Sequence, residues 1–333
     1  MKKLVMWLFL LIASISFGCS TNNKNGQDIQ VLKFNNNGEF KIAQFTDLHF
    51  DTGSEESKPV IELISYMLDA EQPDLVVFTG DVVTGKQAKE GWRSVLEPVV
   101  ERGIPFAVTL GNHDDEHDTT RGEVQEIISA YPGSLLSKVQ NVSESGDYFV
   151  HLQAHEGQGV LATLYFMDSN AYSTLENVEG WGWFTFEQVE WFRQQSLNIK
   201  RNNGVIIPAL AFFHIPLPEY REAFNSESAI KIGQRNEDEC PPEINTGMFA
   251  AMLLAGDVMG AFVGHDHVND YLVNHYGIGL GYGRHSGGTN SYGDLTRGAR
   301  IIKLPEGKRQ FRTWLHLVNG EIADDVIFPD DFQ

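Results

Sequence analysis

Side chains of the types that bind metals recur in this chain directly after short apolar runs. The clearest case is the segment Gly111–Asp114, which carries an amide, an imidazole and a carboxylate and follows the apolar run Ile104–Leu110. Further runs end in the same way, at Asp47 and His49, at Asp81, at His214, and at His265 and His267. A set of His, Asp and Asn suits metals such as Zn, Mn and Fe. The residue types therefore predict a metal site assembled from segments far apart along the chain.

The apolar runs themselves have the length and composition of buried strands. Besides Ile104–Leu110 they are Lys41–Phe45, Leu75–Phe78, Leu210–Phe213 and Gly260–Val263. In a parallel or mixed sheet the carboxyl ends of the strands lie along one edge, and such sheets bind ligands there. We therefore expect the polar residues that follow these runs to converge.

Amphipathic helices are predicted between the first strands, at Ser57–Gln72, Gly91–Arg102 and Arg121–Ala130. Strand, helix and strand in alternation indicate a parallel portion of sheet. A further strand is expected at Ala162–Asp168 and a helix at Phe186–Asn202, with Thr185 as its N-cap. After Gly277 the pattern changes to short strands, including Arg300–Leu304 and Arg312–Leu317. This change suggests a second, more antiparallel sheet packed on the first.

Five polar blocks in this order resemble a known family. The blocks are Asp47-x-His49, Gly80-Asp81, Gly111-Asn112-His113-Asp114, His214-Ile215-Pro216 and Gly264-His265-Asp266-His267. Together they resemble the calcineurin-like metallophosphoesterase superfamily, and most closely the Asp-x-His subgroup of purple-acid-phosphatase-like proteins. The resemblance covers about Phe40 to Leu304. It implies an α/β fold in which two mixed β-sheets pack as a sandwich flanked by helices, in the layer order α-β-β-α.

The resemblance also implies a dinuclear metal centre of divalent or trivalent ions, with Mn, Fe and Zn as candidates. One ion would be held by Asp47, His49 and His267, the other by Asn112, His214 and His265, and Asp81 would bridge both. Elementary chemistry agrees, because a carboxylate has two oxygens to share and two neighbouring metals can clamp both sides of a phosphoryl transfer. Residues two apart in an extended chain also point the same way, so Asp47 with His49, and His265 with His267, are expected to face one cluster.

The implied reaction is hydrolysis of phosphomonoesters by a hydroxide that the dinuclear centre activates. His113 is the candidate proton donor to the leaving oxygen, because histidine changes charge near neutral pH. Asp114 either orients His113 or simply ends the strand. Two alternatives stay open: a phosphodiesterase or pyrophosphohydrolase of the same fold, and a non-catalytic lipoprotein that binds metal or sugar phosphate.

One position departs from the family pattern. Purple-coloured members carry a tyrosine three residues after the bridging aspartate, and protein phosphatases carry an aspartate there, whereas this chain has Thr84. The absent tyrosine argues against a tyrosinate–iron site. The absent aspartate leaves the partner of His113 open and weakens an assignment as a protein phosphatase.

The N-terminus has the order of a secretory signal. Lys2 and Lys3 precede the apolar run Leu4–Ala13, and small residues lead to Cys19. We expect a signal peptide over residues 1–18, a lipid-anchored tether over 19–38 and a single domain over 39–333. The Gly-Cys junction resembles a bacterial lipobox, so export to the cell envelope is expected, with a lipid at Cys19 as the membrane contact in the periplasm or at the outer membrane. Ser16 departs from that pattern and keeps ordinary secretion open.

The formal net charge of −20 makes nucleic acid an unfavourable partner, so a small phosphoester is the expected one. Nothing in the sequence sets an oligomeric state. Five histidines lie outside the polar blocks and outside the acidic stretch Asp114–Asp118. They are expected to form structural hydrogen bonds: His151, His155, His275, His285 and His316. His117 is expected to be solvated, and Cys240 to be a bystander. Residues 277–293 are predicted to form a flexible loop.

Three further groups have alternative interpretations. Arg284 and Arg235 are expected to be solvated charges, with contact to the substrate phosphate as the alternative. The aromatic residues near the predicted helix start belong either to the core or to a rim around the site. They are Trp181, Trp183, Phe184 and Phe186.

Overall fold

The computed structural model describes residues 31–136, 143, 146–289 and 291–333. The predicted signal peptide and the first part of the tether, residues 1–30, lie outside the described residues. Residues 31–38, which the sequence assigns to the tether, are part of the fold. Leu32 and Phe34 are buried, and strand β1 (Leu32–Lys33) pairs with β5. The alternation of Leu32, Lys33 and Phe34 places both apolar side chains on one face, and the folded domain therefore begins before residue 39.

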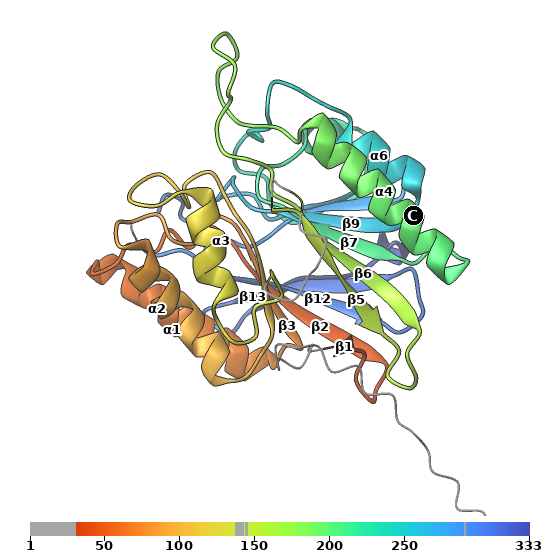
Figure 1. The fold of residues 1–333 in the computed structure, drawn as a ribbon, viewed down its shortest axis with the longest axis horizontal. Helices are drawn as coiled ribbons and strands as arrows, with labels where there is room; N and C mark the ends of the chain where they lie inside the picture. Colours follow the sequence, from red (N-terminus) through yellow and green to blue (C-terminus); the bar gives the residue numbers. More distant parts are fainter. Residues whose placement is uncertain (1–30, 137–142, 144–145, 290) are drawn as a thin grey trace, which may run out of the picture.

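Two mixed β-sheets pack face to face, with helices on both outer faces (Figure 1). The six-stranded sheet has the order β14-β13-β12-β2-β3-β4. Its strands are β2 (Glu39–Phe45), β3 (Leu75–Thr79), β4 (Phe106–Thr109), β12 (Gly298–Pro305), β13 (Phe311–Leu317) and β14 (Ile322–Phe328). The eight-stranded sheet has the order β1-β5-β6-β7-β9-β11-β10-β8. Its other strands are β5 (Tyr148–Gln153), β6 (Val160–Phe166), β7 (Ala209–Phe212), β8 (Lys231–Ile232), β9 (Val258–Val263), β10 (Leu272–His275) and β11 (Ile278–Tyr282). The predicted α-β-β-α sandwich is confirmed.

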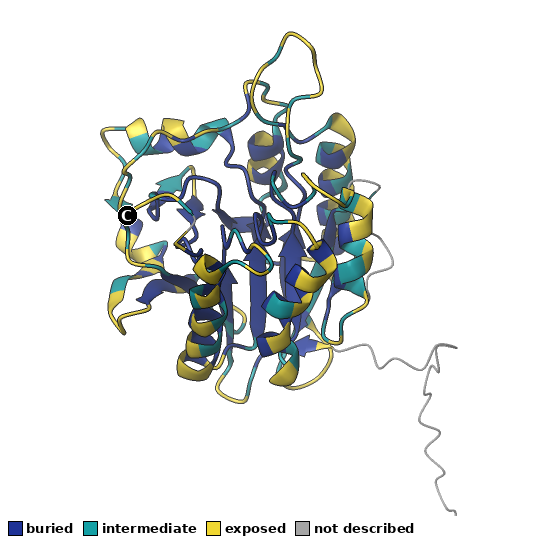
Figure 2. Cartoon of the chain, turned by 90° about the vertical axis from the view of Figure 1, so that its left-hand side faces the viewer, coloured by how far each residue is buried: buried dark blue, intermediate teal, exposed yellow. Residues whose placement is uncertain are grey.

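Alternating side chains of the central strands build the layers. In β3, Leu75 and Val77 face the other sheet, whereas Val76 and Phe78 pack in the core beneath the helices. Successive side chains of a strand point to opposite faces, and both faces of these strands are covered, so the runs are apolar throughout. Figure 2 shows the strands as the buried centre of the molecule.

Three helices cover each outer face. α1 (Lys58–Glu71), α2 (Ala88–Glu101) and α3 (Arg121–Ser129) lie on the six-stranded sheet, and α4 (Phe186–Asn203), α5 (Pro218–Asn225) and α6 (Met248–Ala255) lie on the eight-stranded sheet. Two short 3-10 helices, η1 (Glu55–Ser57) and η3 (Asp330–Phe332), complete the described elements. Thr185 caps α4 as predicted, in a reciprocal pair of hydrogen bonds with Gln188. Within the described part of the chain, every helix is too short or too polar to span a bilayer.

The division of strands between the sheets differs from the prediction. The C-terminal strands β12–β14 do not form the second sheet, because β12 pairs antiparallel with β2 and extends the first. Its residues alternate between the two cores, with Ile301 toward the helices and Ile302 toward the other sheet. Such a strand is apolar on both faces, and its sequence does not reveal its neighbour. The strands that precede the polar blocks are thereby split, with β2, β3 and β4 in one sheet and β7 and β9 in the other.

The predicted flexible loop at residues 277–293 is also wrong in part. It contains β11, whose residues are all buried. Gly279 and Gly281 lie where a Cβ atom would come within 3.0 Å of Phe311 and of Leu272, respectively. Gly279 therefore allows close packing of the two sheets, and Gly281 leaves room for the side chain of a neighbouring strand in its own sheet, so neither marks flexibility.

Candidate metal centre

The polar blocks meet where the strands of the two sheets end. Backbone hydrogen bonds join them: the Asp47 N–H donates to the Gly80 carbonyl at 3.1 Å, and the Gly264 N–H donates to the His214 carbonyl at 3.1 Å. Four of the predicted ligands have left-handed backbone angles, with φ of 53° at Asp47, 46° at His49, 50° at Asp81 and 79° at His265. Such angles are costly for residues with a Cβ and occur at functional sites. They turn the chain sharply as it leaves each strand.

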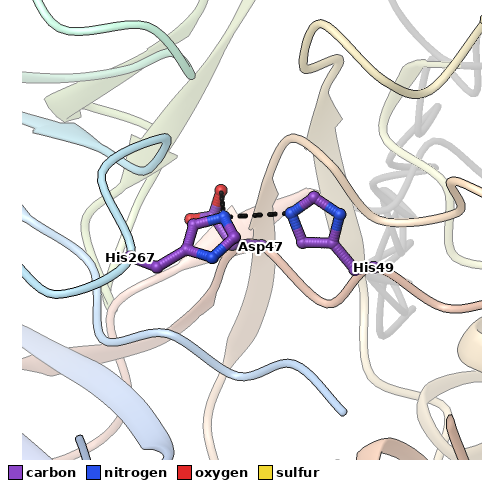
Figure 3. Close-up of side chains that lie close together, drawn as sticks. All are labelled: Asp47, His49 and His267. Carbon is purple, nitrogen blue, oxygen red and sulfur yellow. Dashed lines mark hydrogen bonds and ion pairs between the residues drawn. The ribbon is translucent and has the colours of Figure 1, made fainter. Parts of the chain in front are cut away.

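Asp47, His49 and His267 form one group of converging ligand atoms. Their donor atoms all lie within 4.8 Å of one another (Figure 3). The two Nε2 atoms of His49 and His267 are 3.0 Å apart, and His267 Nε2 lies 3.5 Å from Asp47 Oδ1. Ligand atoms at about 2 Å from a common ion have separations of this size. The donor set and its spacing therefore fit a metal ion.

Asp81, His214 and His265 form the second group, again with donor atoms within 4.8 Å of one another. Asn112 adds an amide oxygen, which lies 3.1 Å from His214 Nε2. Asp81 Oδ2 lies 3.2 Å from His214 Nε2 and 3.8 Å from His49 Nε2, so this carboxylate reaches both groups. All seven residues of the predicted ligand set are thus brought together.

Neighbouring groups set the orientation of two of the histidines. His214 donates its Nδ1–H to the Thr79 carbonyl at 2.7 Å, and this hydrogen bond orients the ring so that Nε2 faces Asp81. His267 Nδ1 lies 2.9 Å from Ser291 Oγ, and His285 Nε2 lies 3.0 Å from the same oxygen. The His285 ring also stacks on His267 with centroids 4.8 Å apart. His285 thus has the predicted structural contacts, behind a residue of the metal centre.

The charges of the site are those of a cation-binding cage. Burial alone would raise the pKa of Asp81, but the charge of His214 and its hydrogen bond hold that pKa far below the usual range. Burial lowers the pKa of His214, but the charge of Asp81 and its hydrogen bond outweigh burial and raise this pKa to about 9. Burial lowers the pKa of His49 to about 4 and that of His265 to about 3. His267 and His214 likewise hold the pKa of Asp47 below its usual range against the effect of burial, so both carboxylates are charged at neutral pH. His49 and His265 are neutral, as metal ligands must be, whereas His214 must lose a proton to bind a metal.

The family model for calcineurin-like phosphoesterases matches residues 40–269 of this chain. The chain belongs to the calcineurin-like phosphoesterase family. It is 36% identical over 321 residues to an Arabidopsis thaliana protein named "Probable inactive purple acid phosphatase 29", covering 85% of this chain and 81% of the relative. It is 33% identical over 343 residues to the Saccharomyces cerevisiae phosphatase DCR2, covering 91% of this chain and 57% of the relative. The predicted resemblance is confirmed.

Solved structures share the fold of this calcineurin-like phosphoesterase. A dimetal phosphatase from Danio rerio superposes with a TM-score of 0.61 at 11% identity, covering 86% of this chain and 98% of that one. A purple acid phosphatase from yellow lupin superposes with a TM-score of 0.53 at 12% identity, covering 87% of this chain and 53% of that one. At these identities the likeness concerns the fold.

Asp114 has a structural position in this phosphoesterase. It is buried, and its carboxylate accepts backbone N–H groups of Gly111 at 2.7 Å, Asp81 at 3.0 Å, Val82 at 2.8 Å and Val83 at 3.0 Å. These contacts tie the Asp81 loop to the Gly111 turn. Of the two predicted alternatives, orienting His113 or ending the strand, the hydrogen bonds favour the second and add the anchoring of the Asp81 loop.

His113 lies at the edge of the metal centre. Its backbone N–H donates to Asp81 Oδ1 at 2.8 Å, and its ring lies 5.6 Å from that of His49. Its Nδ1 lies 2.7 Å from Glu116 Oε2, and the other oxygen of Glu116 accepts the Tyr172 hydroxyl. The sequence prediction missed both Glu116 and Tyr172. The available signal is the three-residue spacing from His113 to Glu116. It is hidden because Glu116 stands in the acidic stretch Asp114–Asp118.

A cavity of about 250 Å³ opens over the metal centre. Its walls combine five residues of the centre or its edge with aromatic, hydroxyl, thiol and carboxyl groups: His49, Asp81, His113, His265, His267, Trp181, Tyr292, Ser291, Cys240 and Asp266. Burial and the nearby Asp266 carboxylate raise the pKa of the Cys240 thiol to about 12, so this thiol stays protonated at neutral pH. That agrees with the prediction that Cys240 is no nucleophile.

The remaining candidate residues from the sequence have different positions in the structure, and only one of them lines the cavity. Arg284 is buried, pairs with Asp270 and donates to the Thr296 carbonyl at 2.7 Å, so it is neither a solvated charge nor a cavity residue. Arg235 pairs with Glu239 at 2.8 Å. Of the four aromatic residues, Trp181 lines the cavity, Phe184 is buried in the core and Phe186 is exposed. His117 is exposed, as predicted.

Proposed function

We propose that this protein is an exported, metal-dependent phosphoesterase that hydrolyses phosphomonoesters. The observation that carries the proposal is the pair of ligand groups joined by Asp81, with His113 in the wall of the same cavity. Two bound metal ions supply positive charge for the phosphoryl oxygens and lower the pKa of water. Family membership supports phosphoester hydrolysis as the class of reaction.

Each predicted ligand has a part in this proposal. Asp47, His49 and His267 hold one ion, Asn112, His214 and His265 hold the other, and Asp81 is shared. The set contains two carboxylates, so a centre with two divalent ions keeps a net positive charge. Such a centre attracts a phosphate dianion even though the whole protein is strongly acidic.

His113 is the proposed proton donor to the leaving alcohol. Its Nδ1–H is held by Glu116, which leaves Nε2 as the nitrogen that can deliver a proton in the cavity. The carboxylate also fixes the orientation of the ring that a general acid requires. Glu116 thereby takes the place that the family pattern leaves open at Thr84.

The size of the cavity favours monoesters over diesters. About 250 Å³ lies below the usual range of small-molecule pockets, and a diester must fit a second substituent on phosphorus. The diesterase or pyrophosphohydrolase alternative must place that second substituent in the same space or in the solvent beyond it. The word "inactive" in the name of the Arabidopsis thaliana relative favours the other alternative, a non-catalytic protein that binds metal or phosphate.

One assay distinguishes these possibilities. Protein loaded with Mn, Fe or Zn is tested on p-nitrophenyl phosphate and bis-p-nitrophenyl phosphate, and its metal content is measured. Faster monoester hydrolysis supports the proposal, and faster diester hydrolysis favours the diesterase. No turnover by protein that holds two metals would favour the non-catalytic alternative.

The Asp81→Asn variant tests the shared carboxylate. Because Asp81 reaches both ligand groups, its loss should lower the occupancy of both metals together. Two full metal equivalents in that variant contradict the bridge.

Export and lipid anchoring at Cys19 are part of the same proposal. The support is the order of charge, apolar run, small residues and cysteine at the N-terminus. A bacterial host that expresses the full chain should incorporate labelled fatty acid into the wild type, and the Cys19→Ala variant should not. Equal labelling of both proteins contradicts the anchor.

A further inference from the structure

Two tyrosine–glutamate pairs flank the cavity over the metal centre. On one side the Tyr172 hydroxyl donates to Glu116, and on the other the Tyr292 hydroxyl donates to Glu237 Oε1 at 3.0 Å. The Tyr292 ring stacks on His267, with centroids 4.0 Å apart and an angle of 13° between the planes. The Tyr172 ring lies 6.4 Å from His113. Each tyrosine ring thus lies next to a residue of the proposed reaction centre, and each tyrosine hydroxyl is hydrogen-bonded to a glutamate carboxylate.

Trp181 continues the aromatic surface from Tyr172 to the metal centre. Its ring lies 4.5 Å from His265 in an edge-to-face arrangement and 5.4 Å from the ring of Tyr172. Trp181 and Tyr292 both line the cavity. Tyr172 is outside the lining itself but contacts the lining residues Trp181 and His113, and with 44% exposure for Tyr172 and 53% for Tyr292 both rings are accessible from solvent.

Among the described residues that line the cavity, no lysine or arginine offsets the negative charges of Glu116 and Glu237. Three arginines in this region have carboxylate partners of their own, because Arg121 binds Asp168 and Asp115, Arg284 binds Asp270, and Arg221 binds Glu239. Moving outward from the metal centre, the cavity therefore changes from a site for an anion to an aromatic and acidic surface.

We propose that this cavity selects phosphate monoesters whose leaving alcohol carries an ammonium group, with phosphocholine and phosphoethanolamine as representatives of the class. The inference rests on the proposed phosphomonoesterase function. The phosphate lies at the metal centre, and the cationic end of the alcohol lies among Tyr172, Trp181 and Tyr292. Aromatic faces attract ammonium groups, and nearby carboxylates add to that attraction. A leaving group with further negative charge meets repulsion from the same carboxylates.

The reaction stays an ordinary hydrolysis. Water attacks phosphorus, the bond between phosphorus and the alcohol oxygen breaks, and His113 supplies a proton to that oxygen. The products are inorganic phosphate and a neutral hydroxyl group on a cationic alcohol. The ammonium group is unchanged, so the aromatic walls contribute to recognition and not to bond breaking.

The test compares phosphocholine with 3,3-dimethylbutyl phosphate, in which a carbon atom replaces the quaternary nitrogen. The two substrates have the same shape and differ in charge. With the metal-loaded, full-length protein, we expect kcat/KM to be about tenfold higher for phosphocholine, from the aromatic rings and the glutamate charges acting together.

Glu237→Gln is the matching variant. Glutamine keeps an oxygen to accept the Tyr292 hydroxyl and the Val268 N–H, now 3.1 Å from Glu237 Oε1, but removes the charge. The preference for phosphocholine should fall to about twofold, since the aromatic rings remain. Because the readout is a ratio within one protein, a general loss of activity cancels. Glu156→Gln removes the same charge from an 88% exposed side chain in the turn before β6, at the end of the strand remote from the cavity, and should keep the full ratio.

The outcomes separate the two proposals. If the metal-loaded protein hydrolyses neither substrate nor p-nitrophenyl phosphate, the proposed function fails. If it hydrolyses them with a phosphocholine ratio near one, the function stands and the inference is overturned. A ratio that survives Glu237→Gln overturns it as well.

Discussion

Glu116 lies three residues after His113 and holds its ring, with Oε2 placed 2.7 Å from Nδ1. The second oxygen of Glu116 accepts the Tyr172 hydroxyl, so the carboxylate is itself held in position. A carboxylate on Nδ1 fixes the tautomer and the orientation of a histidine. The pair therefore accounts for how His113 can act as an acid although Thr84 provides no carboxylate.

Glu116→Gln is expected to slow turnover by about tenfold to a hundredfold, the usual effect of losing a group that supports a functional histidine. The metals should stay bound, because Glu116 is outside both ligand groups. The loss should be largest for substrates with poor leaving groups, since these depend most on proton donation. A series of aryl phosphates with different leaving-group pKa measures this. The Tyr172→Phe control keeps the glutamate and should lose less, and an equal loss across the series contradicts the role of Glu116.

Asp114→Asn should destabilise the protein by about 1 to 3 kcal/mol. The carboxylate accepts four backbone N–H groups, and an amide nitrogen in its place leaves some of these buried donors without an acceptor. Urea denaturation of the metal-free protein measures the change. Because these contacts hold the Asp81 loop, metal affinity should fall as well. Unchanged stability contradicts the anchoring role.

The strands, the helices and the convergence of the candidate metal ligands could be predicted because their signals are local. Strands such as β3 are continuous apolar runs, and the ligand blocks come directly after them. The pairing of β12 with β2 could not be predicted, because Ile301 and Ile302 suit any strand that is buried on both faces. Which strands pair is decided by competition among all the strands of the chain, and the sequence of one strand does not show the outcome of that competition.

The supporting residues of the site could not be predicted for a related reason. Ser291 and Tyr292 are separated from His267 by more than twenty positions and carry no motif of their own. Glu116 looks like its exposed acidic neighbours until the fold places it against His113. A ligand is identified by its type and its place after a strand, whereas a second residue behind it is identified by contact alone.

Gly111→Ala should disrupt the metal centre. A Cβ atom at Gly111 would lie 2.2 Å from Asp81 Oδ1 and 2.3 Å from the Asp81 nitrogen, so the shared carboxylate must move. A displacement of about 1 Å at a reacting centre costs about a hundredfold in rate, and we expect a loss of that order together with weaker binding of both metals. Gly122→Ala is the control, because a Cβ there meets nothing within 4 Å and lies in α3. It should leave turnover unchanged and raise stability by about 0.5 to 1 kcal/mol. Full metal occupancy in Gly111→Ala contradicts the expected close packing.

Glu71 gives a stability effect that depends on pH. It ends α1 and is buried against β13, where it accepts Trp314 Nε1–H at 3.1 Å and His316 Nδ1–H at 2.6 Å, with Lys41 Nζ 3.2 Å away. Burial by itself raises the pKa of Glu71, but these partners together hold it below its ordinary value of 4.5. A carboxyl group whose pKa is lower in the folded state stabilises that state above the unfolded pKa. The stabilisation is lost as the pH falls through the folded pKa.

Glu71→Gln should therefore lower the free energy of unfolding by about 1 to 3 kcal/mol at pH 7, from weakened hydrogen bonds to a charged acceptor. The difference from the wild type should shrink once the pH falls below about 4.5, where the wild-type carboxyl begins to take up a proton in the unfolded chain. Urea denaturation of both proteins in the metal-free state, at pH 7 and at successively lower pH, measures the two free energies. Glu62→Gln, on the same helix and outside the buried core, should show no comparable difference. A difference between wild type and Glu71→Gln that is constant with pH would mean that shape and packing, and not the charge of Glu71, join α1 to β13.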